Sequence, residues 1–158
     1  EQGRANVFRT IGRDDAQGFI AGNYLADRWG NKKIAILHDN STYGKGLADE
    51  TRKQLNKRGV TEAVYDAYIP GKDDYSAEVA ALQTAGVSAL YVGGYHAEVA
   101  LIARAAHDSG YTVQLISGDA LATEEFALIA GPAAEGTLFT FPADPRRGLE
   151  AAAVVEQF

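Results

Sequence analysis

The chain has 158 residues, the size of one domain, and 46% of them are hydrophobic, which is ample for a core. Its net charge of −6 and the lack of any Lys/Arg run argue against a nucleic-acid partner. Cysteine is absent, which excludes a disulfide framework and a cysteine-based metal or redox site. No apolar run reaches transmembrane length. The sequence contains no methionine, even at its first residue, and we therefore expect a processed protein or a fragment.

Short apolar runs alternate with segments of helical periodicity along the whole chain. Gly59, Gly86 and Gly110 each follow one helical segment, as expected of a C′ glycine. The segment 7–11 resembles a strand, and a last helical stretch runs toward Phe158. In chain order the other predicted elements are a helix over residues 14–29, a strand over 33–38, a helix over 43–58, a strand over 62–68, a helix over 75–85, a strand over 89–92, a helix around 99–106, a strand over 113–116, a helix over 123–130 and a strand over 136–141.

Start signals and apolar spacing refine the first two predicted helices. Asp14 or Asp15 is the expected N-cap of the first helix, and Ser41 or Thr42 that of the second. The buried face of the first helix is expected to carry the residues at helical spacing, Phe19, Gly22, Ala26 and Trp29.

Continuous apolar strands separated by helices imply a parallel sheet covered on both faces. The expected fold class is therefore α/β, a doubly wound parallel sheet with helices on both faces. We expect one such unit to occupy residues 1–158. In an open sheet of this kind, ligands bind in the crevice beyond the carboxyl ends of the strands.

Two predicted strands run out into glycine-containing turns that each present one polar side chain. Tyr95 follows the segment 91–94, and Asp119 follows the segment 115–118. A phenol beside a carboxylate suits a small zwitterion, with the carboxylate facing an ammonium group, and does not suit a phosphate. The sequence therefore predicts a site for a small amino compound.

Each of these residues also has a structural interpretation. Tyr95 is an ordinary residue to pack at a strand end, and Asp119 suits a turn or a helix cap. His38 and His96 lie on different predicted loops and lack a clustered carboxylate–histidine pattern, so structural roles are favoured over metal or acid–base roles.

Motifs of nucleotide binding and catalysis are missing from the sequence. It contains no G-x-x-x-x-G-K-[ST] phosphate loop, no G-x-G-x-x-G after a strand and no G-x-S-x-G nucleophile elbow. We therefore expect no enzymatic activity, no cofactor and no metal site.

A set of short motifs, taken together and in order, resembles the periplasmic branched-chain amino-acid-binding proteins of ABC importers. The resemblance spans nearly the whole chain and corresponds to the second lobe of that family's two-lobed, type I periplasmic-binding-protein fold. The motifs are Phe8-Arg-Thr10, Ile34-Ala-Ile-Leu-His-Asp39, Tyr43-Gly-Lys-Gly46, Asp73-Asp-Tyr-Ser76, Gly93-Gly-Tyr-His96 and Ile129-Ala-Gly-Pro-Ala-Ala-Glu-Gly136.

The resemblance implies a function and a set of partners. In that family an amino acid lies between two lobes joined by crossing strands, and closure of the lobes delivers it to an ABC permease in the membrane. The expected partners are thus the amino-acid ligand, the missing first lobe and the permease. The expected location is periplasmic, or extracytoplasmic with a lipid anchor in a Gram-positive organism. Receptors and transcription regulators use the same architecture as a ligand sensor, which is the alternative.

Carried over residue by residue, the resemblance implies three ligand contacts. Tyr95 matches a tyrosine that hydrogen-bonds the head group of the ligand, and Tyr43 lies at a position near the ligand side chain. Asp119 stands where many leucine-type binders have a glutamate that pairs with the α-ammonium group. The shorter side chain keeps the charge and sets it about one methylene further back.

Overall fold

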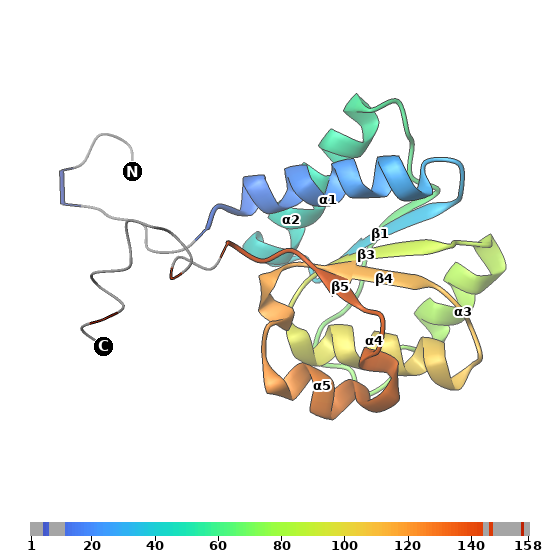
Figure 1. The fold of residues 1–158 in the computed structure, drawn as a ribbon. Helices are drawn as coiled ribbons and strands as arrows, with labels where there is room; N and C mark the ends of the chain where they lie inside the picture. The colour runs from blue at the N-terminus through green and yellow to red at the C-terminus, as the bar shows by residue number, and fades with distance from the viewer. Residues whose placement is uncertain (1–4, 7–11, 144–145, 147–155, 157–158) are drawn as a thin grey trace.

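Five parallel strands form a single sheet in the order β2-β1-β3-β4-β5, as the computed structural model shows (Figure 1). The structure describes residues 5–6, 12–143, 146 and 156. The predicted strand at 7–11 and the predicted last helix toward Phe158 lie outside the described residues.

The predicted elements between residues 14 and 141 are all present. The helices are α1 (Asp14–Trp29), α2 (Thr42–Lys57), α3 (Ser76–Ala85), α4 (His96–Asp108) and α5 (Glu124–Ala130), with short 3₁₀ helices η1 (Asp119–Leu121) and η2 (Gly131–Ala134). The strands are β1 (Ile34–His38), β2 (Val64–Ala67), β3 (Ala89–Gly93), β4 (Gln114–Ser117) and β5 (Leu138–Phe139). The two edge strands, β2 and β5, are shorter than predicted, and each pairs with one neighbour only.

Helices cover both faces of the sheet, so the predicted doubly wound α/β fold is confirmed. Every residue of β1 and of β3 is buried. Ile34 and Ile36 join the core under α1 and α2, whereas Ala35 and Leu37 join the core on the opposite face, under α3, α4 and α5 (Figure 1). This alternation follows from the two-residue period of a strand. None of the helices among the described residues is long and apolar enough to cross a bilayer.

The predicted buried face of α1 is wrong at Phe19 and is confirmed at Gly22, whereas Ala26 and Trp29 are partly buried against the core under α1 and α2. Phe19 is 52% exposed, and the buried positions of α1 are Gln17, Gly18, Ala21, Gly22 and Leu25. The reason is a close approach of α1 to α2. A Cβ added to Gly18 would lie 2.6 Å from Cβ of Glu50, and one added to Gly22 would lie 2.6 Å from the carbonyl oxygen of Thr51. Glycines, rather than aromatic residues, therefore define the contact face.

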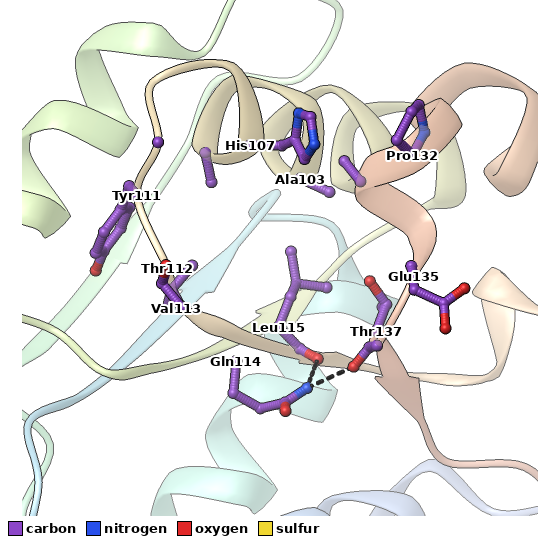
Figure 2. Close-up of a pocket in the computed structure, with 14 residues that line it drawn as sticks. Ala103, His107, Tyr111, Thr112, Val113, Gln114, Leu115, Pro132, Glu135 and Thr137 are labelled. Carbon is purple, nitrogen blue, oxygen red and sulfur yellow. Dashed lines mark hydrogen bonds between the residues drawn. The ribbon is translucent and has the colours of Figure 1, made fainter.

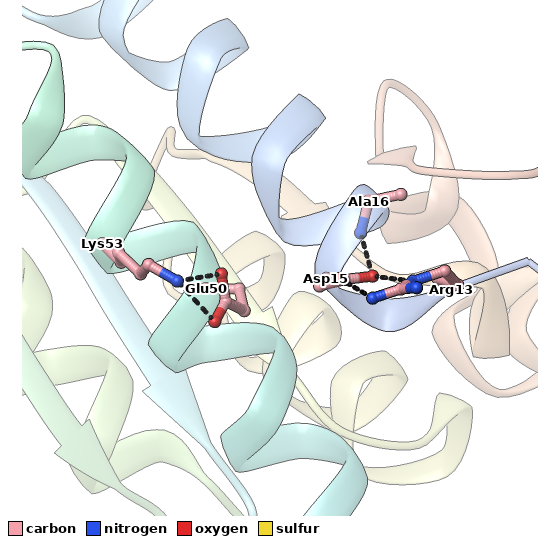
Figure 3. Close-up of polar contacts among 5 residues, drawn as sticks. All are labelled: Arg13, Asp15, Ala16, Glu50 and Lys53. Carbon is pink, nitrogen blue, oxygen red and sulfur yellow. Dashed lines mark hydrogen bonds and ion pairs between the residues drawn. The ribbon is translucent and has the colours of Figure 1, made fainter. Parts of the chain in front are cut away.

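The helix ends follow local hydrogen-bonding rules. Arg13, not Asp14 or Asp15, occupies the N-cap position of α1, and the Asp15 carboxylate instead accepts from the amide of Ala16 (2.9 Å) and pairs with Arg13 (2.5 Å) within the first turn (Figure 3). Ser41 is the N-cap of α2, as predicted, and its hydroxyl accepts from the amide of Gly44 at 2.9 Å. Gly59, Gly86 and Gly110 have positive φ angles of 79°, 72° and 70°, so the three predicted helix ends are confirmed.

Candidate functional site

The three predicted site residues meet at the carboxyl edge of the sheet. Tyr43 follows β1 at the start of α2, Tyr95 follows β3 and precedes α4, and Asp119 follows β4 at the start of η1. From β1 the chain continues to β2 on one side of the sheet, and β3 lies on the other side, so the strand order reverses between β1 and β3. Crevices at such a reversal are where doubly wound folds bind small ligands.

A direct hydrogen bond joins two of these residues. The Tyr43 hydroxyl donates to Oδ1 of Asp119 at 2.8 Å, and it accepts from the amide of Ala120 at 3.3 Å. Burial, together with the hydrogen bond to Asp119, raises the pKa of Tyr43 far above its ordinary value, so this hydroxyl stays a donor. A carboxylate has about four acceptor positions, and Asp119 therefore keeps capacity for a further cationic donor.

Tyr95 completes the arrangement as an aromatic side chain open to solvent. It is the N-cap residue of α4 and is 50% exposed. Its ring centroid lies 5.2 Å from that of Tyr43, with an angle of 34° between the ring planes. Two phenol rings thus stand beside one carboxylate, and the Tyr95 ring is half exposed to solvent.

Glycines let these side chains come together. A Cβ added to Gly118 would lie 2.9 Å from the Tyr43 hydroxyl, too close for a side chain, so glycine at this position lets Tyr43 reach Asp119. A Cβ on Gly44 would lie 2.5 Å from the carbonyl oxygen of Gly93, because the first turn of α2 packs directly on the end of β3. This contact brings the Tyr43 and Tyr95 segments close together.

The sequence reasoning missed Gln17, a buried polar residue behind the site. It lies on α1, is 6% exposed, and its Oε1 accepts hydrogen bonds from the amide of Asp119 (3.1 Å) and the hydroxyl of Thr140 (2.6 Å). These bonds join segments more than 100 residues apart in sequence. The first-turn position of Gln17 in a helix gives no signal of such a contact, because a glutamine there is ordinarily solvated.

Both histidines near this edge have structural partners. His38 is 4% exposed, its Nδ1 accepts from the amide of Asn40 (3.1 Å), and its ring lies against that of Tyr65. His96 Nε2 lies 2.8 Å from Oε2 of Glu125 and so links the start of α4 to α5. Among the described residues there is no group of three or more metal-ligating side chains with the arrangement of a metal site.

His38 should make the free energy of unfolding depend on pH. Burial, and then the positive charge of Lys45, lower the pKa of His38 in the folded protein below the ordinary value of 6.5, although Asp49, Asp39 and Asp66 oppose the shift. A depressed pKa means that the unfolded chain takes up the proton more readily. The contribution of His38 is therefore complete above pH 6.5 and is lost as the pH falls through the folded-state pKa.

Urea unfolding at a series of pH values between about 7.5 and 5 measures this dependence. Relative to wild type, His38→Gln should flatten the fall in stability on the acid side. His107→Gln is the matched control, because the His107 side chain is 54% exposed, and it should leave the profile unchanged. Equal acid-side slopes in wild type and His38→Gln would contradict the assignment.

One cavity lies at the opposite end of the sheet from Tyr43, Tyr95 and Asp119. It has a volume of about 350 Å³ and sits between the last turns of α4, the start of β4 and η2 (Figure 2). Gln114 crosses its floor, where its Nε2 donates to the carbonyl oxygens of Gly136 and Leu115. Tyr43, Tyr95 and Asp119 do not line it. We place the candidate site at these three residues because a carboxylate and two phenol rings lie together at the strand-order reversal.

The chain is an open parallel α/β sheet with a carboxylate and two tyrosines at its strand-order reversal. The whole chain, residues 1–158, matches the family described as periplasmic binding protein, and the chain belongs to that family. The resemblance inferred from the sequence motifs is thus confirmed.

Curated relatives and solved structures agree with this family. The chain is 50% identical over its whole length to the Leu/Ile/Val-binding protein homolog 1 of Brucella suis, of which it covers 43%. It is 42% identical to an amino acid binding protein of Pseudomonas aeruginosa, again covering 43% of it. The structure of the leucine-binding protein LivK of Thermotoga maritima superimposes with a TM-score of 0.81 at 28% identity, over 99% of this chain and 45% of that protein. The chain therefore spans less than half the length of these relatives.

Proposed function

We propose that the chain is one lobe of an extracytoplasmic solute-binding protein that captures an amino acid for import by an ABC transporter. The observation that carries this proposal is the Tyr43–Asp119 hydrogen-bonded pair beside the exposed Tyr95 ring, at the strand-order reversal of the sheet. The proposed role is capture and release, not catalysis. The proposed location is the periplasm, or the outer face of the membrane through a lipid anchor.

Each of the three residues takes a part in holding the ligand. Asp119 pairs with the α-ammonium group, and the Tyr43 hydroxyl fixes the direction of that carboxylate through its 2.8 Å hydrogen bond. Tyr95 offers a hydroxyl to the head group and a ring face to the ligand side chain. A pair of unit charges about 4 Å apart attracts by about 1 kcal/mol in water and by about 4 kcal/mol near a protein surface, so exclusion of water strengthens the ammonium contact.

The openness of the site supports a second wall supplied by another lobe. Tyr95 is 50% exposed, and none of the three residues lines the cavity of about 350 Å³. The relatives at 50% identity are more than twice as long as the chain, which leaves room for a first lobe. Ligand binding would then favour the closed arrangement, because only that arrangement brings both sets of contacts to the ligand.

The relatives also indicate the class of amino acid. The Brucella suis relative is named as a Leu/Ile/Val-binding protein, and the LivJ protein of Streptococcus pneumoniae, solved with isoleucine, superimposes with a TM-score of 0.76 at 25% identity over 98% of this chain and 45% of that protein. We propose a branched-chain or other small aliphatic amino acid as the ligand of this protein. The permease of the same transporter is the proposed partner.

Calorimetric titration of the full-length protein that contains this chain tests the proposal. A panel of amino acids should reveal one class that binds with a Kd of about 1 μM or tighter, roughly −8 kcal/mol. The control ligand is the 2-hydroxy analogue of the best amino acid, which lacks the ammonium group and should bind far more weakly. Absence of binding by every amino acid would contradict the proposed function, and equal binding of the hydroxy analogue would remove Asp119 from the ammonium contact.

A further inference from the structure

The side chain of Gln17, on α1, is hydrogen-bonded to two segments that are distant in sequence. Its side-chain oxygen accepts two hydrogen bonds, one from the amide of Asp119 and one from the hydroxyl of Thr140. The residue is 6% exposed, so water does not compete freely for these bonds. Three segments therefore meet at one oxygen atom: the first turn of α1, the turn after β4 and the residue that follows β5.

The orientation of the Gln17 amide is fixed by its partners. The amide of Asp119 can only donate, so the oxygen of Gln17 must face it. Nε2 is consequently turned away, and it is buried without a hydrogen-bond partner among the described residues. An unpaired buried donor costs stability. The two hydrogen bonds that the Gln17 oxygen accepts, one of which holds the Asp119 turn, offset this cost.

We propose that Gln17 is the positioning residue for the Asp119 carboxylate and that it ties this carboxylate to the chain segment at Thr140. The inference rests on the proposed function, since it assigns Asp119 to the ammonium group of the ligand. Gln17 does not touch the ligand. It acts by holding the backbone of Asp119 while Tyr43 holds the side chain.

The geometry of the turn explains why such a residue is needed. Gly118 and Asp119 form the start of a three-residue 3₁₀ helix, in which Leu121 donates back to the carbonyl of Gly118 at 3.3 Å. A turn this short has little structure of its own to fix the direction of the carboxylate. It is instead held from two sides, by Tyr43 of α2 and by Gln17 of α1. Loss of either side leaves the carboxylate free to move from its binding direction.

Gln17 also joins this turn to the segment that follows β5. Thr140 continues the pairing of β5 with β4, because its amide donates to the carbonyl of Ser117 at 3.1 Å. Two residues later, Pro142 lies beside Gly12, where a Cβ added to the glycine would be 3.6 Å from Cβ of Pro142. The segments 12–13 and 140–142, which flank the sheet, thus run side by side next to Gln17. A displacement of either segment is therefore transmitted to the Asp119 turn through the Gln17 side chain.

The test is Gln17→Met in the full-length protein, which keeps the length of the side chain and removes the acceptor. Binding of the best amino acid should weaken about 10-fold, because the ligand must then fix the direction of a carboxylate that the protein no longer holds in place, and a 10-fold change corresponds to about 1.4 kcal/mol. Gln54→Met is the matched control. Gln54 is also a buried glutamine of the α1–α2 contact, 9% exposed, and its Nε2 donates to Asn23 at 2.9 Å, away from Asp119. It should change the affinity less than about twofold, even where it lowers the melting temperature as much.

A double-mutant cycle separates positioning from a general structural effect. In the Asp119→Asn background, Gln17→Met should weaken the remaining affinity less than about twofold, because the charge that it positions is already gone. An equal 10-fold loss in both backgrounds would overturn the proposal. Thr140→Val provides a second variant that leaves Gln17 in place; about a threefold loss of affinity is expected, and no loss would overturn the link to the segment after β5.

Hydrogen exchange of the Asp119 amide provides a measurement that needs no ligand. Gln17→Met should accelerate this exchange at least about 10-fold, since the amide loses its acceptor, and Gln54→Met should not. Unchanged exchange in Gln17→Met would overturn the inference whatever the binding data show. A wild-type protein that binds no amino acid would contradict the proposed function alone, and exchange would then decide the structural link. Loss of binding in Asp119→Asn with wild-type binding in Gln17→Met would overturn the inference alone.

Discussion

Asp119→Asn should weaken binding of the amino-acid ligand by about 30-fold to about 5,000-fold. The substitution keeps the size of the side chain and removes the negative charge. It also keeps Oδ1, which accepts from the Tyr43 hydroxyl at 2.8 Å in the wild-type protein. Removing one partner of a buried, hydrogen-bonded charge pair costs about 2–5 kcal/mol, and each 1.4 kcal/mol is tenfold in affinity. Calorimetric titration of the full-length protein measures the change.

Two controls show whether the loss comes from the charge at this position. Asp108→Asn removes an aspartate at the exposed end of α4, where the side chain is 68% exposed, and should leave the affinity unchanged. Asp119→Glu keeps the charge and advances it by one methylene, so it should retain more of the affinity than Asp119→Asn. If Asp119→Asn binds with wild-type affinity, this carboxylate does not contact the ligand, even though the chain belongs to the family.

The site could be approached from the sequence because it obeys the geometry of a parallel sheet. Tyr95 and Asp119 each come directly after an apolar run that ends in glycine, and the carboxyl ends of parallel strands meet at one edge. The structure places these two residues and Tyr43 at that edge. Their proximity therefore follows from local signals combined with one rule of topology. The direct bond between Tyr43 and Asp119 does not, because it depends on the rotamer of a residue 76 positions away.

Helix packing shows where the sequence pattern failed. The spacing of Phe19 and Trp29 indicates a hydrophobic face, since large aromatic residues usually mark the buried side of a helix. In α1 the pattern holds at Gly22 and at the partly buried Trp29 and fails at Phe19, because Gly18 and Gly22 allow the backbones of α1 and α2 to approach. The need for such an approach depends on the position of α2, and no periodicity within α1 encodes it.

Gln17 shows a second kind of failure. A hydrophobicity pattern assigns a glutamine in the first helical turn to solvent, whereas here it is 6% exposed and holds Asp119 and Thr140. Buried polar residues are placed by partners from distant segments, and here those partners satisfy the side-chain oxygen of Gln17. A single sequence gives the identity of Gln17 but not the identity of its partners.

Gly93→Ala should lower the stability of the protein by about 3 kcal/mol, which corresponds to about 6–12 °C in melting temperature for a domain of this size. The added methyl group would overlap the carbonyl oxygen of Gly44, and a Cβ at this position would also lie 2.9 Å from the carbonyl carbon of the same residue. Both atoms belong to backbone in the first turn of α2, so no side chain can rotate away. The end of β3 and the start of α2 must separate. Thermal and urea unfolding followed by circular dichroism measure the loss.

Gly46→Ala is the matched control, and Gly46 lies in α2 two residues after Gly44. Nothing lies within 4 Å of a Cβ at Gly46, and the residue is inside the helix, so alanine should stabilise the protein by about 0.5–1 kcal/mol. If Gly93→Ala destabilises the protein and Gly46→Ala stabilises it, contact with the end of β3, not glycine content, sets the position of α2.

Gly93→Ala should also disturb the candidate site. Tyr43 lies in the first turn of α2, and Tyr95 directly follows the end of β3, so separation of these segments should increase the 5.2 Å distance between the two ring centroids. Gly93→Ala should therefore weaken ligand binding even at temperatures where it remains folded, and wild-type affinity in the folded variant would contradict this link between packing and site.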